Sequence, residues 1–288
     1  MAPVAGPSHL SSAERARRAA RGGASRSVPV PLLVPALIAV AFLVLPLVGL
    51  LIRAPWGHLG AALSGSDATQ ALILSLWTAS TATAISLVIG VPLAWVLARS
   101  RFPGQRLLRA LVTLPLVLPP VVGGVALLLA FGRTGFIGQY LNSWFGLTIP
   151  FTPIAVVMAE TFVAMPFLII TVEGALRSAD QGFEEAAATL GAKRMTVFRR
   201  VTLPLIAPSL GAGAVLCWAR ALGEFGATIT FVAAIPGETL TLPSAIYDAT
   251  QTPGHETRAL ALCAISVVIA FAAVLMGERL NGQAARSR

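Results

Sequence analysis

Two opposite charges inside an apolar stretch are the first residues of this chain that could do chemistry. Arg220 and Glu224 stand four residues apart in a stretch that runs from about residue 205 to 234. At this spacing two side chains share one face of a helix and can pair. Charges inside a membrane are costly and usually face the bundle interior or a water-filled path. We therefore expect the pair either to fix helix packing or to line a translocation path. It predicts no high-affinity anion site, because Glu224 would largely neutralise Arg220.

A polar, basic segment from Glu184 to Pro204 separates two strongly apolar stretches and is the second candidate. Glu184 and Glu185 would lie in the first turns of a short helix, near the positive end of its dipole, and Asp180 can cap that helix. Ala186 and Ala187 follow; alanine favours helix, and its small side chain lets another surface approach closely. The segment is therefore suited to contact with a second protein.

The same segment predicts a second helix after a sharp turn. Gly191 suits the left-handed position that ends a helix. A helix from about Lys193 to Thr202 would then lead through Leu203 and Pro204 into the next apolar stretch. From these residues alone, the segment is either an amphipathic interfacial helix with basic anchors or a site that receives a push from a soluble partner.

The elements that must position these residues are long and apolar. Hydrophobic residues make up 56% of the 288-residue chain and charged residues 11%, whereas soluble domains average about 25% charged residues. About 20 apolar residues cross a bilayer as a helix, which satisfies its own backbone hydrogen bonds. The sequence predicts an all-α integral membrane protein with six transmembrane helices, approximately Pro31–Ile52, Ala68–Ala98, Leu107–Phe131, Pro153–Leu176, Leu205–Ala234 and Ala259–Met276.

The third of these stretches is interrupted by prolines. Pro115, Pro119 and Pro120 are followed by two glycines at positions 123 and 124. Proline removes a backbone donor and clashes with the preceding helical turn, so this helix should be kinked or broken. The break is either a packing irregularity or part of a helix that lines a translocation path.

The domain organisation follows from these stretches. Residues 1–27 are rich in Ala, Arg, Gly and Ser, and we expect a disordered basic tail. Residues 28–280 would form one six-helix transmembrane domain, and residues 281–288 a short tail. Because no loop is long enough to fold alone, we expect no soluble domain.

The net charge of +9 reflects topology rather than nucleic-acid binding. Most Lys and Arg residues lie in the N-terminal segment, at 99–109, at 177–200 and after residue 278, whereas the other three loops hold only Arg53, Arg133 and Arg258. Cytoplasmic loops of membrane proteins carry the excess of Lys and Arg. We therefore expect both termini and the 184–204 segment to face the cytoplasm of a multi-pass inner-membrane protein.

Several kinds of chemistry lack the residues that they need. The chain has no G-x-x-x-x-G-K-[ST] phosphate-binding loop, and its only lysine is Lys193. His9, His58 and His255 all lie outside the apolar stretches, which disfavours an intramembrane enzyme and a His-ligated metal. We expect no catalytic residue, no metal site and no cofactor held by this chain.

The 184–204 segment resembles the cytoplasmic "EAA" loop of ATP-binding-cassette (ABC) importer permeases. The shared pattern is Glu185-Ala186-Ala187, three residues, Gly191, nine residues, and then VTLP ending at Pro204, with Val where the motif usually has Ile. The resemblance implies a type I ABC importer permease fold. It also implies that residues Glu184, Glu185, Ala186, Ala187, Gly191, Leu203 and Pro204 couple this chain to a separate ATPase.

Three further segments resemble molybdate permeases. They read LPLVLPPVVGG at 114–124, ARALGEFGATITF at 219–231 and IPGETLTLPSAIY at 235–247, within a resemblance that runs from about residue 70 to 280. Sulfate permeases share the Gly-Glu-aromatic-Gly part, whereas the continuation TLPSAIY favours molybdate. These residues do not separate tungstate from molybdate.

The resemblance implies a complex with an established set of parts. Two copies of the chain would join two cytoplasmic ABC ATPase subunits, which bind ATP and Mg, and an extracytoplasmic oxyanion-binding protein. Pro115, Pro119, Pro120, Arg220 and Glu224 would belong to the translocation path. A sulfate or tungstate permease is the alternative within this class, and a stand-alone six-span secondary transporter or channel is the alternative outside it.

Overall fold

The computed structural model describes residues 30–60 and 66–286, and every regular element in these ranges is helical. The predicted tail at residues 1–27 therefore lies outside the described residues. The chain divides after Gly49 into two units. The described part of the first unit belongs to α2 (Val30–Arg53), whose side chains from Pro31 to Gly49 are all exposed. A helix that is apolar on all sides needs lipid or other helices around it.

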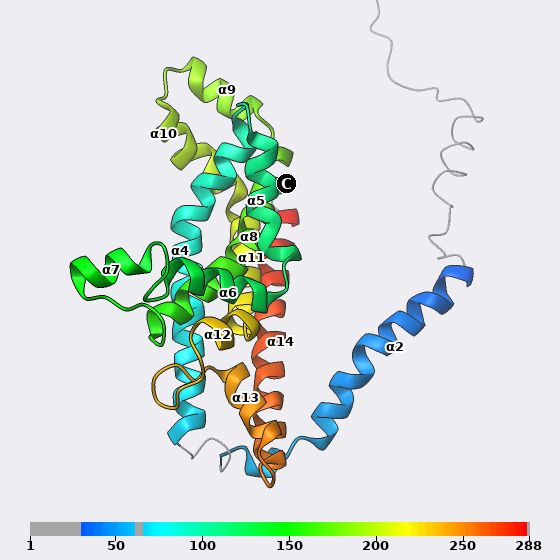
Figure 1. Cartoon of the computed structure of the whole chain (residues 1–288). Coiled ribbons are helices and arrows are strands. Elements are labelled where there is room, and N and C mark those ends of the chain that lie inside the picture. Colours follow the sequence, from blue (N-terminus) through cyan, green and yellow to red (C-terminus); the bar gives the residue numbers. More distant parts are fainter. Residues whose placement is uncertain (1–29, 61–65, 287–288) are drawn as a thin grey trace, which may run out of the picture. The chain divides into compact units, whose positions relative to one another are not determined.

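The second unit is a helical bundle with short helices at both ends (Figure 1). Its long helices are α4 (Ser66–Arg99), α8 (Pro153–Ser178), α11 (Leu203–Leu222) and α14 (Glu256–Arg286), and its shorter helical elements are η1 (Trp56–His58), α5 (Gln105–Val117), α6 (Pro120–Phe131), α7 (Gly138–Phe145), α9 (Gly182–Thr189), α10 (Arg194–Val197), η2 (Phe198–Thr202), α12 (Gly226–Phe231) and α13 (Leu242–Gln251). Residues 281–286, assigned from the sequence to a tail, continue α14.

Within the described residues, five helices are long and apolar enough to cross a membrane, and six spans result if α5 and α6 are counted as one. The five are Pro31–Arg53, Asp67–Arg99, Pro153–Ser178, Arg194–Leu222 and Glu256–Arg279. Between α5 and α6 the chain bends by 116°. The six predicted apolar stretches are all present, and the expected break in the third stretch is confirmed.

Small residues let α4, α8 and α11 pack closely at the centre of the bundle. Ala79, Ala82 and Ala94 of α4 are completely buried. A Cβ added to Gly213 of α11 would lie 3.2 Å from Thr171 of α8, so the two backbones approach one another. Helices in membranes associate through such small residues, because lipid removes the hydrophobic driving force between them.

The fifth apolar stretch is not one helix, and this corrects the expectation of a continuous span from 205 to 234. Helix α11 ends at Leu222, and α12 begins at Gly226. The Glu224 carboxylate accepts a hydrogen bond from the backbone N–H of Ala227 at 2.8 Å, and so satisfies a donor at the start of α12. A short carboxylate-capped break therefore replaces a turn of helix.

Candidate translocation path and coupling loop

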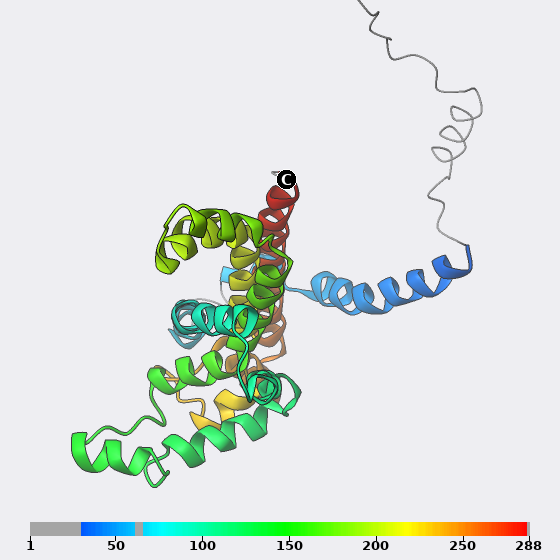
Figure 2. The same ribbon diagram turned by 90° about the horizontal axis from the view of Figure 1, so that it is seen from above.

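The two helix breaks meet in the structure. Helix α6 packs against α12, and Figures 1 and 2 show these short helices side by side. A Cβ added to Gly226 would lie 2.7 Å from the Cβ of Pro120, and one added to Gly124 would lie 2.6 Å from the carbonyl oxygen of Ala227. Real Cβ atoms do not approach other atoms this closely, so the contact requires glycine on both helices.

Of the three prolines predicted for the path, Pro119 and Pro120 form the break. Pro119 precedes α6 in an extended conformation, and its carbonyl accepts from the N–H groups of Val122 and Gly123 at 2.9 and 3.2 Å. Pro120 is the first residue of α6, a position whose N–H has no partner within the helix, so proline costs no hydrogen bond there. Pro115 lies inside α5, before the break. The structure therefore brings Pro120, but not Pro115, against the second break.

Arg220 and Glu224 form an ion pair, as their spacing predicts. Arg220 Nη2 lies 2.7 Å from Glu224 Oε2, and the two side chains are 27% and 1% exposed. The pair does not sit on one uninterrupted helix, because Glu224 lies beyond the end of α11. The glutamate binds the arginine of α11 with one oxygen and the start of α12 with the other. The pair thus holds the break in shape beside the contact between Gly226 and Pro120.

Two further buried polar groups lie in the same region of the bundle and have no role in the sequence-based account of the path. Glu160 of α8 is 1% exposed and accepts from Thr78 of α4 at 2.9 Å. Its Oε2 atom, and the hydroxyl of Thr228 on α12, have no hydrogen-bond partner among the described residues. A lone acid in an apolar stretch is the signal by which the sequence could have revealed Glu160. Thr228 gave no such signal.

The 184–204 segment forms two short helices joined at Gly191, as predicted. Gly191 has φ of +80°, and a Schellman motif ends α9: the N–H of Gly191 donates to Ala188 and that of Ala192 donates to Ala187, at 2.9 and 3.1 Å. Asp180 accepts from the N–H of Gly182 at 2.8 Å at the other end of α9. We call residues 182–202 the coupling loop, after its resemblance to the EAA loop.

Glu184 points inward and ties the coupling loop to the bundle. Its Oε1 lies 2.9 Å from Arg99 Nη2, at the end of α4, and accepts from the Thr202 hydroxyl at 3.0 Å. Glu185 and Ala186 are exposed, and Ala187 is half-buried. The two neighbouring glutamates therefore differ in kind: Glu184 fixes the loop, and Glu185 remains available on its outer surface.

Large apolar side chains are exposed on the same loop, and the sequence analysis missed them. Phe183 is 59% exposed, Leu190 89% and Met195 66%. Clustered apolar side chains on a surface typically mark a contact with another protein or with lipid. Their exposure could not be predicted from the sequence, because mixed charged and apolar residues indicate only an amphipathic helix whose apolar side is normally covered.

The coupling loop continues into the bundle as an unbroken helical run. Helix α10 passes through the π-helical turn η2 directly into α11, whose first two residues are Leu203 and Pro204. The 20 residues of α11 span about 30 Å at 1.5 Å per residue. The coupling loop and Arg220 are therefore joined by one continuous helical run.

A second cluster of charges strengthens the same end of the bundle. Glu173 of α8 binds Arg109 of α5 at 2.9 Å and Arg177 at 2.8 Å. Among residues 30–60 and 66–286, no three His, Cys, Asp or Glu side chains gather as a metal site would require. Cys217 and Cys263 are free. The charged side chains described above form ion pairs within and between helices.

Comparison with known proteins agrees with this arrangement. Residues 90–281 match the family described as "Binding-protein-dependent transport system inner membrane component". The chain is 49% identical to the molybdenum transport system permease protein ModB of Mycobacterium bovis, over 84% of this chain and 90% of that protein. It is also 49% identical to ModB of Escherichia coli K12, over 73% and 92%. Identity to the sulfate transport system permease protein CysT of Salmonella typhimurium is 35%, over 83% and 86%.

Solved structures show the same fold. A chain of a bacterial alginate ABC transporter, crystallised with an alginate-bound periplasmic protein, superposes with a TM-score of 0.68 at 19% identity and covers 87% of this chain and 92% of its own. A chain of the MetNI methionine ABC transporter in an inward-facing conformation superposes with a TM-score of 0.56 at 23% identity, over 74% and 96%. The fold is that of an ABC transporter membrane subunit, and the chain belongs to the family of binding-protein-dependent transport system inner membrane components.

Proposed function

We propose that this chain is the membrane-spanning subunit of an ATP-driven importer for molybdate. One observation carries the coupling part of the proposal. The coupling loop is anchored by Glu184 to Arg99, and it runs without interruption into α11, which carries Arg220. A partner that pulls on the exposed face of the loop therefore acts directly on the charged helix break.

The proposed complex contains two copies of this chain and two cytoplasmic ATPase subunits. Glu185, Ala186, Phe183 and Leu190, all exposed on the coupling loop, would contact the ATPase groove. ATP and Mg bind to the ATPase, and this chain holds no cofactor and carries out no catalysis. An oxyanion-binding protein on the opposite side delivers the substrate, as the relatives in this family and the solved alginate transporter suggest.

The choice of molybdate rests on the relatives. The permeases named for molybdenum are 49% identical to this chain, whereas the sulfate permease of Salmonella typhimurium is 35% identical. Selectivity would come mainly from the binding protein, because a transit path must hold its cargo weakly enough to release it. Because Glu224 neutralises Arg220, the pair would bind a passing anion only weakly, as such a path requires.

The proposed path passes the paired helix breaks. The ion pair, the unpartnered Glu160 oxygen and the Thr228 hydroxyl place buried polar groups in the middle of apolar helices. A shift of α11 would move Arg220, whereas the contact between Gly226 and Pro120 holds α12 against α6. The two sides of the break would therefore move relative to one another. Pro119 and Pro120 form the break at which the direction of α6 could change.

Orientation has a direct test. We propose that the coupling loop and both termini face the cytoplasm. In a variant in which Cys217 and Cys263 are replaced, single cysteines at Gly104 and Gly237 should react oppositely with a membrane-impermeant thiol reagent. Only the cysteine at position 237 should react from outside intact cells, and labelling of position 104 would reverse the proposed orientation.

A transport test addresses the substrate. The chain, its cognate ATPase and its cognate binding protein would be expressed in a bacterium that lacks its own molybdate permease. We expect cellular molybdenum, measured by mass spectrometry at low external molybdate, to be restored. Restoration without the ATPase gene would favour a stand-alone secondary transporter. Restoration of sulfate but not molybdate accumulation would assign the chain to the sulfate group.

A further inference from the structure

A two-part cleft lies between the end of α4 and the coupling loop. The larger part has a volume of about 410 Å³ and is lined on its polar side by Arg99, Glu184 and Glu185. The smaller part has a volume of about 220 Å³ and lies between Pro92 and Met195. Trp95, Arg194 and Phe198 line both parts, so the two volumes adjoin one another.

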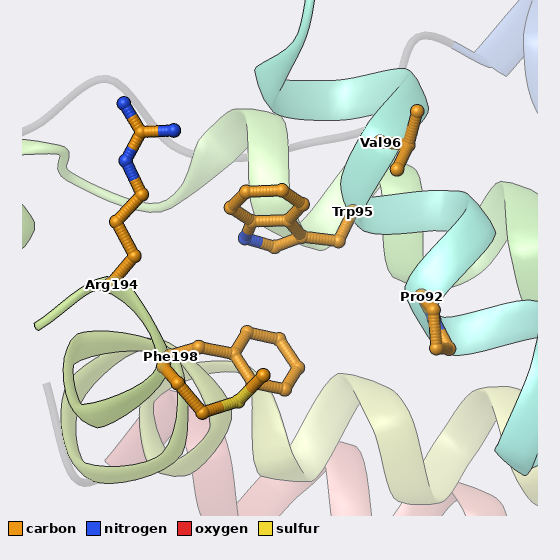
Figure 3. A pocket seen from close by; sticks show the side chains of 6 residues that line it. Pro92, Trp95, Val96, Arg194 and Phe198 are labelled. Atoms are coloured by element: carbon orange, nitrogen blue, oxygen red, sulfur yellow. The ribbon is translucent and has the colours of Figure 1, made fainter.

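The smaller part is an apolar slot. Figure 3 shows Trp95 of α4 next to Phe198 at the wall of the slot, with Pro92 and Val96 on the α4 side. The rings of Trp95 and Phe198 meet edge to face, with centroids 6.3 Å apart and planes at 82°. No charged side chain other than Arg194 lines the slot. Its walls therefore suit a hydrocarbon chain.

The larger part has an unsatisfied cation. The Arg99 side chain is only 9% exposed, and its Nη2 atom is paired with Glu184. Its Nε and Nη1 atoms are buried and have no hydrogen-bond partner among the described residues. Buried N–H groups are normally hydrogen-bonded, and those of a charged guanidinium most strongly favour an anionic oxygen. Glu184 is already committed to Arg99 and Thr202, and Glu185 is exposed at the rim.

The position of the cleft along the helices fits a membrane interface. Arg99 is the last residue of the span that begins at Asp67, and Arg194 is the first residue of the span that ends at Leu222. Trp95 lies one turn before the end of the first of these helices, and tryptophan is a residue that membrane proteins enrich at the level of lipid headgroups. The segments that flank these residues in the chain carry five exposed cations, Arg101, Arg106, Lys193, Arg199 and Arg200.

We infer that this cleft binds a phospholipid with an anionic headgroup, from the leaflet on the side of the coupling loop. The phosphate would accept from the free N–H groups of Arg99 and contact Arg194, and one acyl chain would lie in the slot against Pro92, Trp95 and Met195. Basic pockets between transmembrane helices hold anionic headgroups in this way. The bound lipid would join α4 to the coupling loop and so restrain the loop that transmits motion to α11.

Lipid binding to the purified full-length chain tests this inference without the ATPase or any transport assay. Phosphatidylglycerol and phosphatidylcholine would be titrated separately, and bound lipid counted by native mass spectrometry. We expect one phosphatidylglycerol to bind in preference to phosphatidylcholine. Arg99→Lys, which keeps the charge beside Glu184 but removes the free guanidinium N–H groups, and Arg194→Gln should each weaken binding by about fivefold.

A matched control separates the cleft from general surface charge. Arg101 is exposed, lies two residues from Arg99 and does not line the cleft, so Arg101→Gln should change phosphatidylglycerol binding by less than about twofold. Equal losses in all three variants, or no preference for phosphatidylglycerol, would overturn the inference. Gel-filtration profiles and circular dichroism spectra that match the unsubstituted protein show that each variant is folded.

Two competition experiments distinguish other occupants. Inorganic phosphate at millimolar concentration should not displace the lipid, because it cannot fill the apolar slot; displacement would show a free-anion site instead. The purified ATPase should leave the lipid bound. Loss of the lipid on adding the ATPase would identify the cleft as part of the partner's footprint and would overturn the lipid assignment.

Discussion

Gly191→Val isolates the contribution of a single backbone turn to coupling. Gly191 has φ of +80°, and a Cβ built on it would meet no atom within 4 Å. The substitution therefore creates no clash, and its effect is purely conformational. An L-residue in the left-handed region is destabilised by about 1–2 kcal/mol, and a β-branched side chain by more. The native turn would be populated roughly 5- to 30-fold less often.

The destabilised turn is the Schellman motif that ends α9. Without it, the helix that carries Glu185 and Ala186 points in another direction, whereas the long helices of the bundle do not depend on the turn. We expect the variant to insert and to elute as the native protein does. Co-purification with the ATPase should fall at least fivefold, and binding-protein-stimulated ATP hydrolysis in proteoliposomes should fall with it.

Gly146→Val is the matched control. Gly146 also has positive φ, +66°, and equally open surroundings, but it ends α7, far from the coupling loop in the chain. It should carry a similar backbone penalty and leave ATPase recruitment unchanged. Gly191→Asn should lie between glycine and valine, because asparagine tolerates the left-handed region. Full stimulated hydrolysis and uptake by Gly191→Val would show that the loop is only a surface anchor.

Two other predictions concern the helix breaks. Arg220→Ala leaves the 1% exposed Glu224 carboxylate without its cation; we expect a loss of about 3 kcal/mol, at the low end for a buried pair because the arginine is partly exposed. Adding Glu224→Ala should recover part of the yield of monodisperse protein, and a double variant no better than the single one would refute mutual compensation. Gly124→Ala would place a Cβ 2.6 Å from the Ala227 carbonyl oxygen; we expect about 1–3 kcal/mol of destabilisation and a lower Tm. Gly174→Ala, inside α8 with no atom within 4 Å, should not lower the Tm, because alanine favours helix over glycine. A Gly124→Ala variant as stable as Gly174→Ala would show that α6 and α12 can separate freely.

Local rules predicted most of the fold. Hydropathy located the apolar stretches, proline chemistry located the α5–α6 break, and Gly191 located the end of α9. The second break was missed because LGEFG reads as an uninterrupted apolar stretch with one acid. Its cause is tertiary: Glu224 caps α12, and α12 packs on α6 through Gly226.

The same distinction applies to the candidate site. The spacing of Arg220 and Glu224 was enough to predict their pair. No local pattern showed that Glu184 would bind Arg99, which is 85 residues away, or that Arg99 would keep two free nitrogens. Such partners depend on how α4 and the coupling loop pack. Assignment of the 184–204 segment to coupling also needed family resemblance, since an interfacial helix has the same composition.

Uptake by proteoliposomes tests the central claim most directly. The chain would be reconstituted with its cognate ATPase, with ATP and Mg on the coupling-loop side and the binding protein and radioactive molybdate on the other. We predict molybdate accumulation that requires ATP, ATPase and binding protein together, and that Gly191→Val lowers at least about fivefold while Gly146→Val leaves it unchanged. Accumulation that persists without the ATPase, or that Gly191→Val leaves intact, would contradict the proposal that this chain is an ATP-driven permease worked through its coupling loop.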